Sequence, residues 1–138
     1  MKMLNVVICV VLLAGGGLAI AQTGKSTSAG VYTEEQARKG EKAYQANCAT
    51  CHGADLRSTD PEVPGLTGNS FKGNWLGKTV GEKFQVARDT MPPEAKRSLD
   101  DQTYLDIVTF ILLFNNIPPG KELLRPDMEA LRQIVISQ

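Results

Sequence analysis

Apolar side chains recur at helical spacing in four segments of the chain. The first segment begins at Thr33, which forms a capping-box pattern with Gln36, and its apolar positions continue to Cys48. The second segment begins at an equivalent pair, Thr79 and Glu82. Each pair predicts a helix that starts just after the threonine.

The third segment is the most apolar of the four. Ser98 and Asp101 predict its start, with the aspartate in place of the usual glutamate. One face of this predicted helix is formed by Tyr104, Ile107, Val108, Ile111 and Leu112. The fourth segment runs from Asp127 to about Ile134, although the β-branched residues 134–136 are equally compatible with an extended chain.

Residues 53–78 separate the first two predicted helices and are rich in proline and glycine. No part of this segment alternates as a strand does. A structureless segment of this length is unusual in a compact domain. We therefore expect it to wrap a group that is not protein.

Residues 1–21 have the features of a secretory signal peptide. Lys2 supplies a basic start, residues 6–20 are uncharged, and Ala19-Ile20-Ala21 offers small residues at a cleavage site. The alternative is an uncleaved membrane anchor, for which the apolar run is short. Cys9 lies inside the run and no cysteine directly follows the cleavage site, which argues against a lipid anchor.

After cleavage, the small polar residues 22–30 are expected to form a flexible leader. One domain then occupies residues 31–138, with a C-terminal extension after about residue 117. Length allows no more than this single domain.

Composition narrows the class of protein. The chain has 138 residues, 15 basic and 15 acidic side chains, and 42% hydrophobic residues, which is a globular balance. Zero formal net charge argues against nucleic acid as a partner. Because residues 1–21 hold many of the hydrophobic side chains, the mature domain has a thin core. It also has only two cysteines, too few for a domain stabilised by disulfides.

The segment Cys48-Ala49-Thr50-Cys51-His52 is the C-x-x-C-H signature of c-type haem attachment. Two thiols about one helical turn apart can add to the two vinyl groups on one side of a porphyrin, and His52 can bring a ring nitrogen to the iron. Attachment occurs outside the cytoplasm, in agreement with the predicted signal peptide. One covalent haem c would also supply the apolar surface that the thin core lacks.

Two other interpretations of the cysteine pair are open. A thioredoxin-like C-x-x-C normally follows a strand in a βαβ unit, whereas a capped helix precedes this one. A structural zinc site needs a fourth ligand and usually a second ligand pair.

Iron has a second axial position, and His52 is the only histidine, so bis-histidine ligation within one chain is excluded. The mature chain offers Met91 and Met128. Met91 precedes Pro92-Pro93, which stiffen the backbone, and we predict it as the second iron ligand. Met128 shares a helical spacing with apolar neighbours, so we expect it to pack in the core.

From about Tyr32 to Asn116, the sequence resembles the class I cytochromes c. Gly40-x-x-x-Tyr44 resembles the small and aromatic pair of the first family helix, and residues 104–112, with Phe110 in the aromatic position, resemble the last. The resemblance implies the all-α cytochrome c fold, with about four short helices and long loops around one haem. In that fold the first and last helices cross, and the glycine permits their close approach.

Pro64-Gly65-Leu66 resembles the family loop whose proline carbonyl accepts a hydrogen bond from the ligand histidine, which implies that Pro64 orients His52. A closer resemblance is to the small cytochrome modules that accompany quinoprotein dehydrogenases. It is carried by Gly53-Ala54-Asp55-Leu56, Phe71-x-x-x-Trp75, Thr90-Met91-Pro92 and Asn116-Ile117-Pro118-Pro119-Gly120. The chain is too short to hold the dehydrogenase domain, so this resemblance implies a separate haem subunit or carrier.

Trp75 is the only tryptophan; its indole N–H can bind a haem propionate, and the ring can equally pack in the core. Between Phe71 and Arg97, six basic and three acidic residues give a net charge of +3. These basic residues form either a rim that steers an acidic partner or an ordinary solvated face. They are Lys72, Lys78, Lys83, Arg88, Lys96 and Arg97.

Ligation by His52 and Met91 would saturate the iron, which favours electron transfer over catalysis, and the thioether raises the reduction potential. The sequence therefore predicts a periplasmic carrier or haem subunit without catalytic residues. Its iron would cycle between Fe(III) and Fe(II), with a quinoprotein dehydrogenase as a possible donor and a terminal oxidase as a possible acceptor. One alternative is a haem enzyme or gas sensor whose Met91 leaves the iron. Another is a haem that is purely structural within a larger complex.

Overall fold

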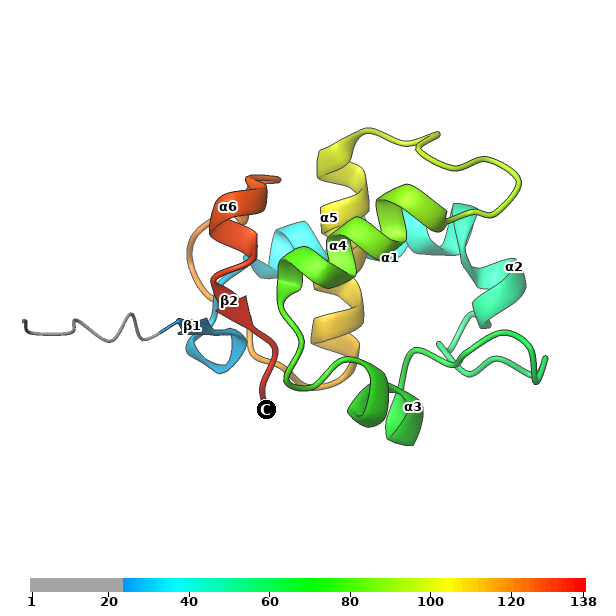
Figure 1. The fold of residues 1–138 in the computed structure, drawn as a ribbon, viewed down its shortest axis with the longest axis horizontal. Helices are drawn as coiled ribbons and strands as arrows, with labels where there is room; N and C mark the ends of the chain where they lie inside the picture. Colours follow the sequence, from blue (N-terminus) through cyan, green and yellow to red (C-terminus); the bar gives the residue numbers. More distant parts are fainter. Residues whose placement is uncertain (1–23) are drawn as a thin grey trace, which may run out of the picture.

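The computed structural model describes residues 24–138, so the predicted signal peptide and Cys9 lie outside the described residues. Helices dominate this part of the chain, and two short strands pair near its ends (Figure 1). The elements in chain order are β1 (Lys25–Ser26), the 3-10 turn η1 (Thr27–Ala29), α1 (Glu34–Asn47), α2 (Ala49–His52), α3 (Gly68–Asn74), α4 (Val80–Thr90), α5 (Asp101–Phe114), α6 (Met128–Leu131) and β2 (Ile134–Val135). The predicted all-α class is confirmed. Within residues 24–138, no helix has the length and hydrophobicity needed to cross a lipid bilayer.

Helices α1 and α5 cross in the middle of the molecule (Figure 1). Gly40 of α1 lies directly against the backbone of Asp106 on α5, and a Cβ atom at residue 40 would overlap the Asp106 carbonyl group. Near the crossing, Tyr44 packs on Phe110 with the ring centroids 5.3 Å apart. The crossing implied by the family resemblance is therefore present, with the glycine at the point of closest approach.

The helix starts follow the sequence in three cases of four, including α6, whose N-cap is Asp127. Thr79 and Glu82 form a complete capping box at the start of α4. Thr33 caps α1 by accepting a hydrogen bond from the Gln36 N–H, but the Gln36 side chain points into the core and does not close a box. The prediction for α5 was two residues early, because its N-cap is Asp100, which accepts from the Thr103 N–H.

The segment 53–78 was predicted to be structureless, and this prediction is wrong because the segment contains α3. Phe71 and Trp75 lie one turn apart, are both buried, and stack with their ring centroids 5.5 Å apart. Burial of these two rings outweighs the poor helix propensity of the glycine and asparagine residues around them. The rest of the segment forms the extended loops to either side of α3 (Figure 1).

The N-terminal residues of the described chain are not a flexible leader. Strand β1 pairs in parallel with β2, with Lys25 opposite Ile134 (Figure 1). Thr27 is fully buried, and its hydroxyl group donates to the Ser137 carbonyl at 3.0 Å. Pairing with the distant C-terminus orders this segment, which local composition does not reveal.

The C-terminal extension is an integral part of the domain. Helix α6 ends at Leu131, so the fourth predicted helix is shorter than expected and the β-branched residues beyond it are extended. Ile136 is fully buried and exchanges backbone hydrogen bonds with Gly77 and Lys78, at 2.9 and 2.8 Å. The extension therefore packs against the turn between α3 and α4.

Candidate functional site

The cysteine motif occupies a sharp turn between two helices. Helix α1 ends at Asn47, Cys48 connects it to α2, and α2 carries both Cys51 and His52. Backbone hydrogen bonds from the Cys51 and His52 N–H groups to the Cys48 carbonyl, at 3.2 and 2.9 Å, close this turn. Both cysteines are free thiols, Cys48 half-buried and Cys51 exposed. One turn of backbone thus holds two thiols and one imidazole.

The loop before α3 fixes the orientation of the imidazole ring. The Nδ1 atom of His52 lies 2.9 Å from the carbonyl oxygen of Pro64. Because a carbonyl oxygen can only accept, Nδ1 is the donor in this hydrogen bond, and Nε2 is the ring nitrogen that remains available to a ligand. The structure places Pro64 at the acceptor position that the family resemblance implies.

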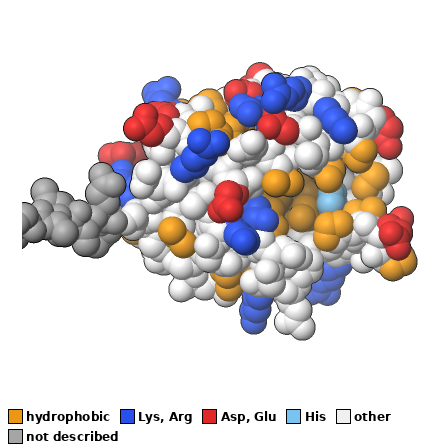
Figure 2. Space-filling model, in the orientation of Figure 1, with side chains coloured by type: hydrophobic (Ala, Val, Ile, Leu, Met, Phe, Trp, Pro, Cys, Tyr) orange, Lys and Arg blue, Asp and Glu red, His pale blue; other side chains and the backbone are white. Residues whose placement is uncertain are grey.

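One cavity of about 310 Å³ brings the predicted site residues together. Its wall is largely apolar, and hydrophobic side chains surround the histidine at the surface (Figure 2). Leu66, Ile107 and Ile111 belong to this apolar wall. The cavity is lined by all of the predicted site residues: Cys48, Cys51, His52, Pro64, Trp75 and Met91.

Met91 lies at the C-terminal end of α4, where the chain leaves the helix with extended backbone before Pro92. The Tyr104 hydroxyl group on α5 donates a hydrogen bond to the Met91 carbonyl at 2.8 Å. Met128, the other methionine of the described chain, is partly buried against the hydrophobic core and is not among the residues that line the cavity. Met128 therefore packs against the core as predicted, whereas the role of Met91 as an iron ligand stays a prediction.

Trp75 and Lys83 bring polar groups to the otherwise largely apolar cavity wall. Trp75 is 7% exposed, and the Lys83 Nζ atom lies 5.4 Å from the centre of its ring. Both residues line the cavity, Trp75 at the end of α3 and Lys83 on α4. Packing of Trp75 on Phe71 is thus present, while its contact with a propionate stays a prediction.

The predicted basic rim is weaker than the net charge of its segment indicates. Arg88 pairs with Asp89 at 2.8 Å and with Asp101 at 3.4 Å, and Arg97 pairs with Asp89 at 3.0 Å. The hydrogen bond from Arg88 is the main reason that the pKa of Asp89 lies below its usual value. Of the six basic residues, Lys83 lines the cavity.

The surroundings of the thiols argue against a thioredoxin-like pair. Burial, reinforced by the neighbouring Cys51, raises the pKa of the Cys48 thiol to about 11. Redox-active C-x-x-C motifs have lowered thiol pKa values instead. The zinc interpretation gains no support either, since the side chains of residues 24–138 form no group of three or more histidine, cysteine or acidic residues that could hold a metal ion.

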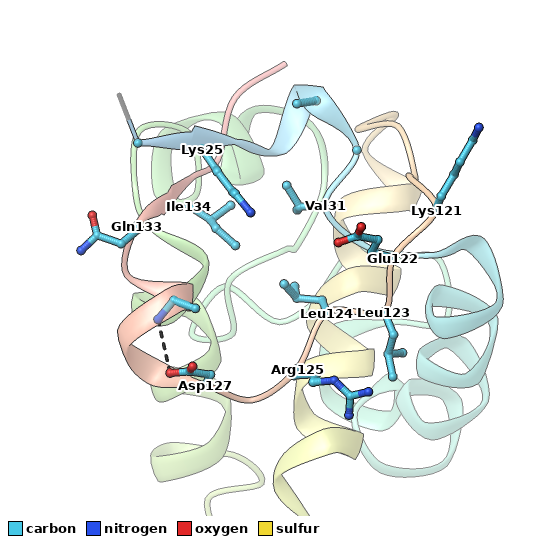
Figure 3. Close-up of a pocket in the computed structure, with 14 residues that line it drawn as sticks. Lys25, Val31, Lys121, Glu122, Leu123, Leu124, Arg125, Asp127, Gln133 and Ile134 are labelled. Atoms are coloured by element: carbon cyan, nitrogen blue, oxygen red, sulfur yellow. Dashed lines mark hydrogen bonds between the residues drawn. The ribbon is translucent and has the colours of Figure 1, made fainter. Parts of the chain in front are cut away.

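A second, larger cavity of about 1190 Å³ lies between the N-terminal segment and the C-terminal extension (Figure 3). The side chains of Val31, Leu124 and Ile134 point into it, and Lys25 and Glu122 lie at its edge. It contains none of the predicted site residues. We therefore place the functional site in the smaller cavity, where the reactive side chains converge.

The donor set of the smaller cavity fits a c-type haem. Two free thiols and an imidazole share one turn, a thioether lines the same cavity, and the wall is apolar. Sequence reasoning missed Tyr104 as a partner of the Met91 backbone and Lys83 as a partner of Trp75. The helical spacing of Tyr104 predicts that it is buried on α5. Its hydrogen bond to Met91 could not be predicted, because it depends on the path of the loop between α4 and α5.

Comparison with known proteins places residues 35–111 in the family described as "Cytochrome C oxidase, cbb3-type, subunit III". Among solved structures, the chain is similar to "Crystal Structure of the Sulfane Dehydrogenase SoxCD from Paracoccus pantotrophus", with a TM-score of 0.52 and 20% sequence identity. That similarity covers 79% of this chain and 62% of the matched chain, so this chain spans less than two thirds of the matched chain's length. At this identity the similarity concerns the fold. No curated protein matches the chain.

Proposed function

This chain belongs to the cytochrome c family, which gives it a haem-based electron-transfer role, and from that premise we propose its ligands, location and place in an electron-transfer chain. It carries one c-type haem held by thioether bonds to Cys48 and Cys51, with His52 and Met91 as axial ligands. The observation that carries this proposal is the convergence of both thiols, the imidazole and the thioether on one apolar cavity.

Each protein group has a defined task in this proposal. The Pro64 carbonyl accepts a hydrogen bond from Nδ1 of His52, which would leave Nε2 as the nitrogen that holds the iron. Tyr104 anchors the Met91 backbone by a hydrogen bond to its carbonyl, and the Met91 thioether would be the second ligand of the iron. The apolar wall, which includes Ile107 and Ile111, excludes water and favours the less charged state of the site.

When bound, the haem supplies a single-electron redox couple. Two protein ligands leave no free axial position, so the chain is a carrier or an electron-transfer subunit and not a catalyst. With His52 on α2 and Met91 at the end of α4 as its ligands, the iron would change its geometry little between the two redox states, which would lower the cost of electron transfer.

The proposed location is the periplasm, after removal of residues 1–21. The signal-like N-terminus and the requirement for haem attachment outside the cytoplasm support this location. The proposed donor is a dehydrogenase-type redox protein, with a terminal oxidase downstream. The resemblance to modules of quinoprotein dehydrogenases supports a donor of this type, and the cited sulfane dehydrogenase structure shares the fold.

The test is a visible spectrum and a mass spectrum of the protein exported in a host that matures c-type cytochromes. We expect one covalent haem and, in the ferric protein, the weak absorption band at the red end of the spectrum that reports iron–methionine bonding. Met91→Ala should abolish this band and allow carbon monoxide to bind the ferrous protein. Met128→Ala is the matched control and should keep the band.

Three outcomes would contradict the proposal. A colourless wild-type protein would exclude the haem. Loss of the band in Met128→Ala but not in Met91→Ala would show that the ligand is Met128 and not Met91. Ready binding of carbon monoxide by the wild-type protein would favour the alternative of a haem enzyme or gas sensor.

A further inference from the structure

Four charged side chains form a connected network at the loop between α4 and α5. This loop, residues 91–100, leaves the end of α4 and returns to the start of α5 (Figure 1). Arg88 pairs with Asp89 at 2.8 Å and with Asp101 at 3.4 Å, and Arg97 pairs with Asp89 at 3.0 Å. The other ion pairs in the described part of the chain are exposed pairs within α1. The network therefore belongs to this loop and to the helix ends that it connects.

Arg88 is the anchored member of the network. Its guanidinium carbon lies 5.2 Å from the centre of the Phe84 ring, which is fully buried. The side chains of Arg88 and Asp89 are 20% and 25% exposed, so water and salt screen their charges less than those of a surface pair. The end of α4 therefore presents a carboxylate in a fixed position.

Arg97 ties the loop to this carboxylate. Its side chain pairs with Asp89, and its backbone N–H donates a hydrogen bond to the Arg88 carbonyl at 3.2 Å. The backbone of Arg97 has a φ of 56°, a left-handed conformation that is unfavourable for a residue other than glycine. Contacts from both its side chain and its backbone hold this conformation, so the loop is fastened back onto α4.

We propose that Asp89 is a positioning residue, which holds the loop through Arg97 and so favours the bond between the Met91 thioether and the iron. This inference rests on the proposed function, because it requires Met91 as a ligand. Asp89 is not among the residues that line the cavity, so it acts through the path of the loop and not by contact with the haem. The two arginines, which the sequence places in a basic rim, then have an internal task instead of a partner to steer.

Release of Met91 from the iron requires the loop to move away from α4. This movement separates Arg97 from Asp89 and breaks the hydrogen bond to the Arg88 carbonyl. Loss of the ion pair therefore favours the open loop and raises the apparent affinity of any ligand that replaces the methionine. Salt screens the ion pair, whereas the hydrogen bond from Tyr104 to Met91 joins neutral groups and is not screened in this way.

The experiment is a titration of the exported, haem-loaded ferric protein with imidazole, followed by loss of the iron–methionine band. In Asp89→Asn we expect the imidazole affinity to be about two- to fivefold higher than in the wild type, as for loss of a partly exposed ion pair. The ratio of the two affinities should fall toward one as salt rises from about 0.02 M to about 0.5 M. Glu34→Gln is the matched control, because it removes the same charge and breaks an exposed pair with Arg38 on α1, and it should keep the wild-type affinity.

Further variants distinguish positioning of the loop from a general effect on stability. Asp89→Glu keeps the charge and should restore an affinity closer to that of the wild type. Arg97→Met removes the other half of the pair, so the double variant should match Asp89→Asn and not show the product of the two effects. Hydrogen exchange should be faster in residues 91–100 of Asp89→Asn, with smaller changes in α1.

The results separate this inference from the proposed function. If the wild-type protein has the iron–methionine band, and Asp89→Asn and Glu34→Gln bind imidazole equally well, the inference is overturned and the proposed function stands. A haem-loaded wild-type protein without this band contradicts the proposed methionine ligand, and the inference falls with it. Should Asp89→Asn fail to fold, Arg97→Met, whose side chain is 65% exposed in the wild type, decides the question by the same titration.

Discussion

The Tyr104 hydroxyl group donates a hydrogen bond of 2.8 Å to the backbone carbonyl of Met91. Tyr104 lies in the first turn of α5, the helix that crosses α1, so this bond ties the end of α4 to the centre of the fold. The proposed methionine ligand is therefore held by its backbone, and its thioether would be available to the iron.

Tyr104→Phe should weaken this attachment. The loss of one hydrogen bond costs about 1 kcal/mol, so the Met91 side of the site should open more often, and exogenous imidazole should displace the methionine with up to about fivefold higher affinity. The measurement is a titration of the ferric protein with imidazole, followed by loss of the iron–methionine band.

Tyr32→Phe is the control for this prediction. The Tyr32 hydroxyl group donates to the Ile117 carbonyl at 2.6 Å, also in the buried core, but away from Met91. It should lower the free energy of unfolding by a similar amount and leave the imidazole affinity unchanged. Equal imidazole affinities in the two variants would show that Tyr104 has no specific effect on Met91.

Gly40→Ala should strongly destabilise the domain. A Cβ atom at residue 40 would overlap the carbonyl group of Asp106, and both partners are helix backbone that cannot move independently. The helices α1 and α5 would have to separate, at a cost of about 1–3 kcal/mol or more. Urea unfolding followed by circular dichroism measures the change.

Gly73→Ala is the matched substitution in a helix with free space. No atom lies within 4 Å of a Cβ added at residue 73 of α3. Here the substitution should raise the free energy of unfolding by about 0.4–1 kcal/mol, because alanine restricts the unfolded chain. A loss of stability in Gly73→Ala similar to that in Gly40→Ala would contradict the steric explanation.

The residues of the site could be predicted because their chemistry is local in the sequence. Cys48, Cys51 and His52 share one turn, and Met91 is marked by the prolines that follow it. The capping box at Thr79 could be predicted for the same reason, because its two residues are only three positions apart in the sequence. Nothing comparable identifies the Lys83 contact with Trp75, which exists only once α3 and α4 have packed.

Two errors in the predicted fold, at α3 and in the N-terminal segment, have the same physical cause, which is packing between parts of the chain that are far apart in the sequence. Helix α3 forms because Phe71 and Trp75 are buried together, although its glycines resemble those of a loop. The order of the N-terminal segment depends on Ile134, more than a hundred residues away. Tertiary contacts of this kind override composition and local propensity.

Asp100 should make the stability of α5 depend on pH. Hydrogen bonds from the Thr103 hydroxyl group and then from its N–H lower the pKa of Asp100 from its ordinary value of 3.8. A lowered pKa in the folded state means that the contribution to stability is complete above the unfolded value and is lost as the pH falls through the folded value. Asp100→Asn keeps a capping side chain but cannot titrate, so its stability relative to the wild type should rise below about pH 4.

Two further variants separate the effect of the Asp100 capping hydrogen bond from the effect of its negative charge. Asp100→Ala removes the cap and should cost about 1 kcal/mol at neutral pH as well as in acid. Thr103→Val removes the hydroxyl donor, which lies 2.6 Å from the Asp100 carboxylate, and should raise the Asp100 pKa toward the ordinary value. A carboxylate titration by NMR measures this pKa. An unchanged Asp100 pKa in Thr103→Val would show that the Thr103 hydroxyl group is not the cause of the lowered pKa.

Gln36 should be the residue that secures the C-terminal extension to the helical core. Its amide group donates to the Asp106 carboxylate and to the Leu124 carbonyl, both at 2.9 Å, and accepts from the Leu124 N–H at 3.0 Å. Gln36→Ala leaves the buried Leu124 N–H without its acceptor, at a cost of about 1–3 kcal/mol. The extension should then open locally more often than the helices do.

Limited proteolysis combined with hydrogen exchange tests this expectation. In Gln36→Ala, we expect faster cleavage and faster exchange in residues 118–138, with smaller changes in α1 and α5. Gln45→Ala is the control, since Gln45 lies on the same helix α1 as Gln36 and donates only an exposed hydrogen bond, of 3.0 Å, to the Ala54 carbonyl. Because Gln102 also donates to Asp106 at 2.8 Å and to the Leu124 carbonyl at 3.1 Å, the double variant with Gln102→Ala should open the extension further. Equal exchange in the extension of Gln36→Ala and Gln45→Ala would mean that the strand pairing and Ile136 hold the extension without this amide.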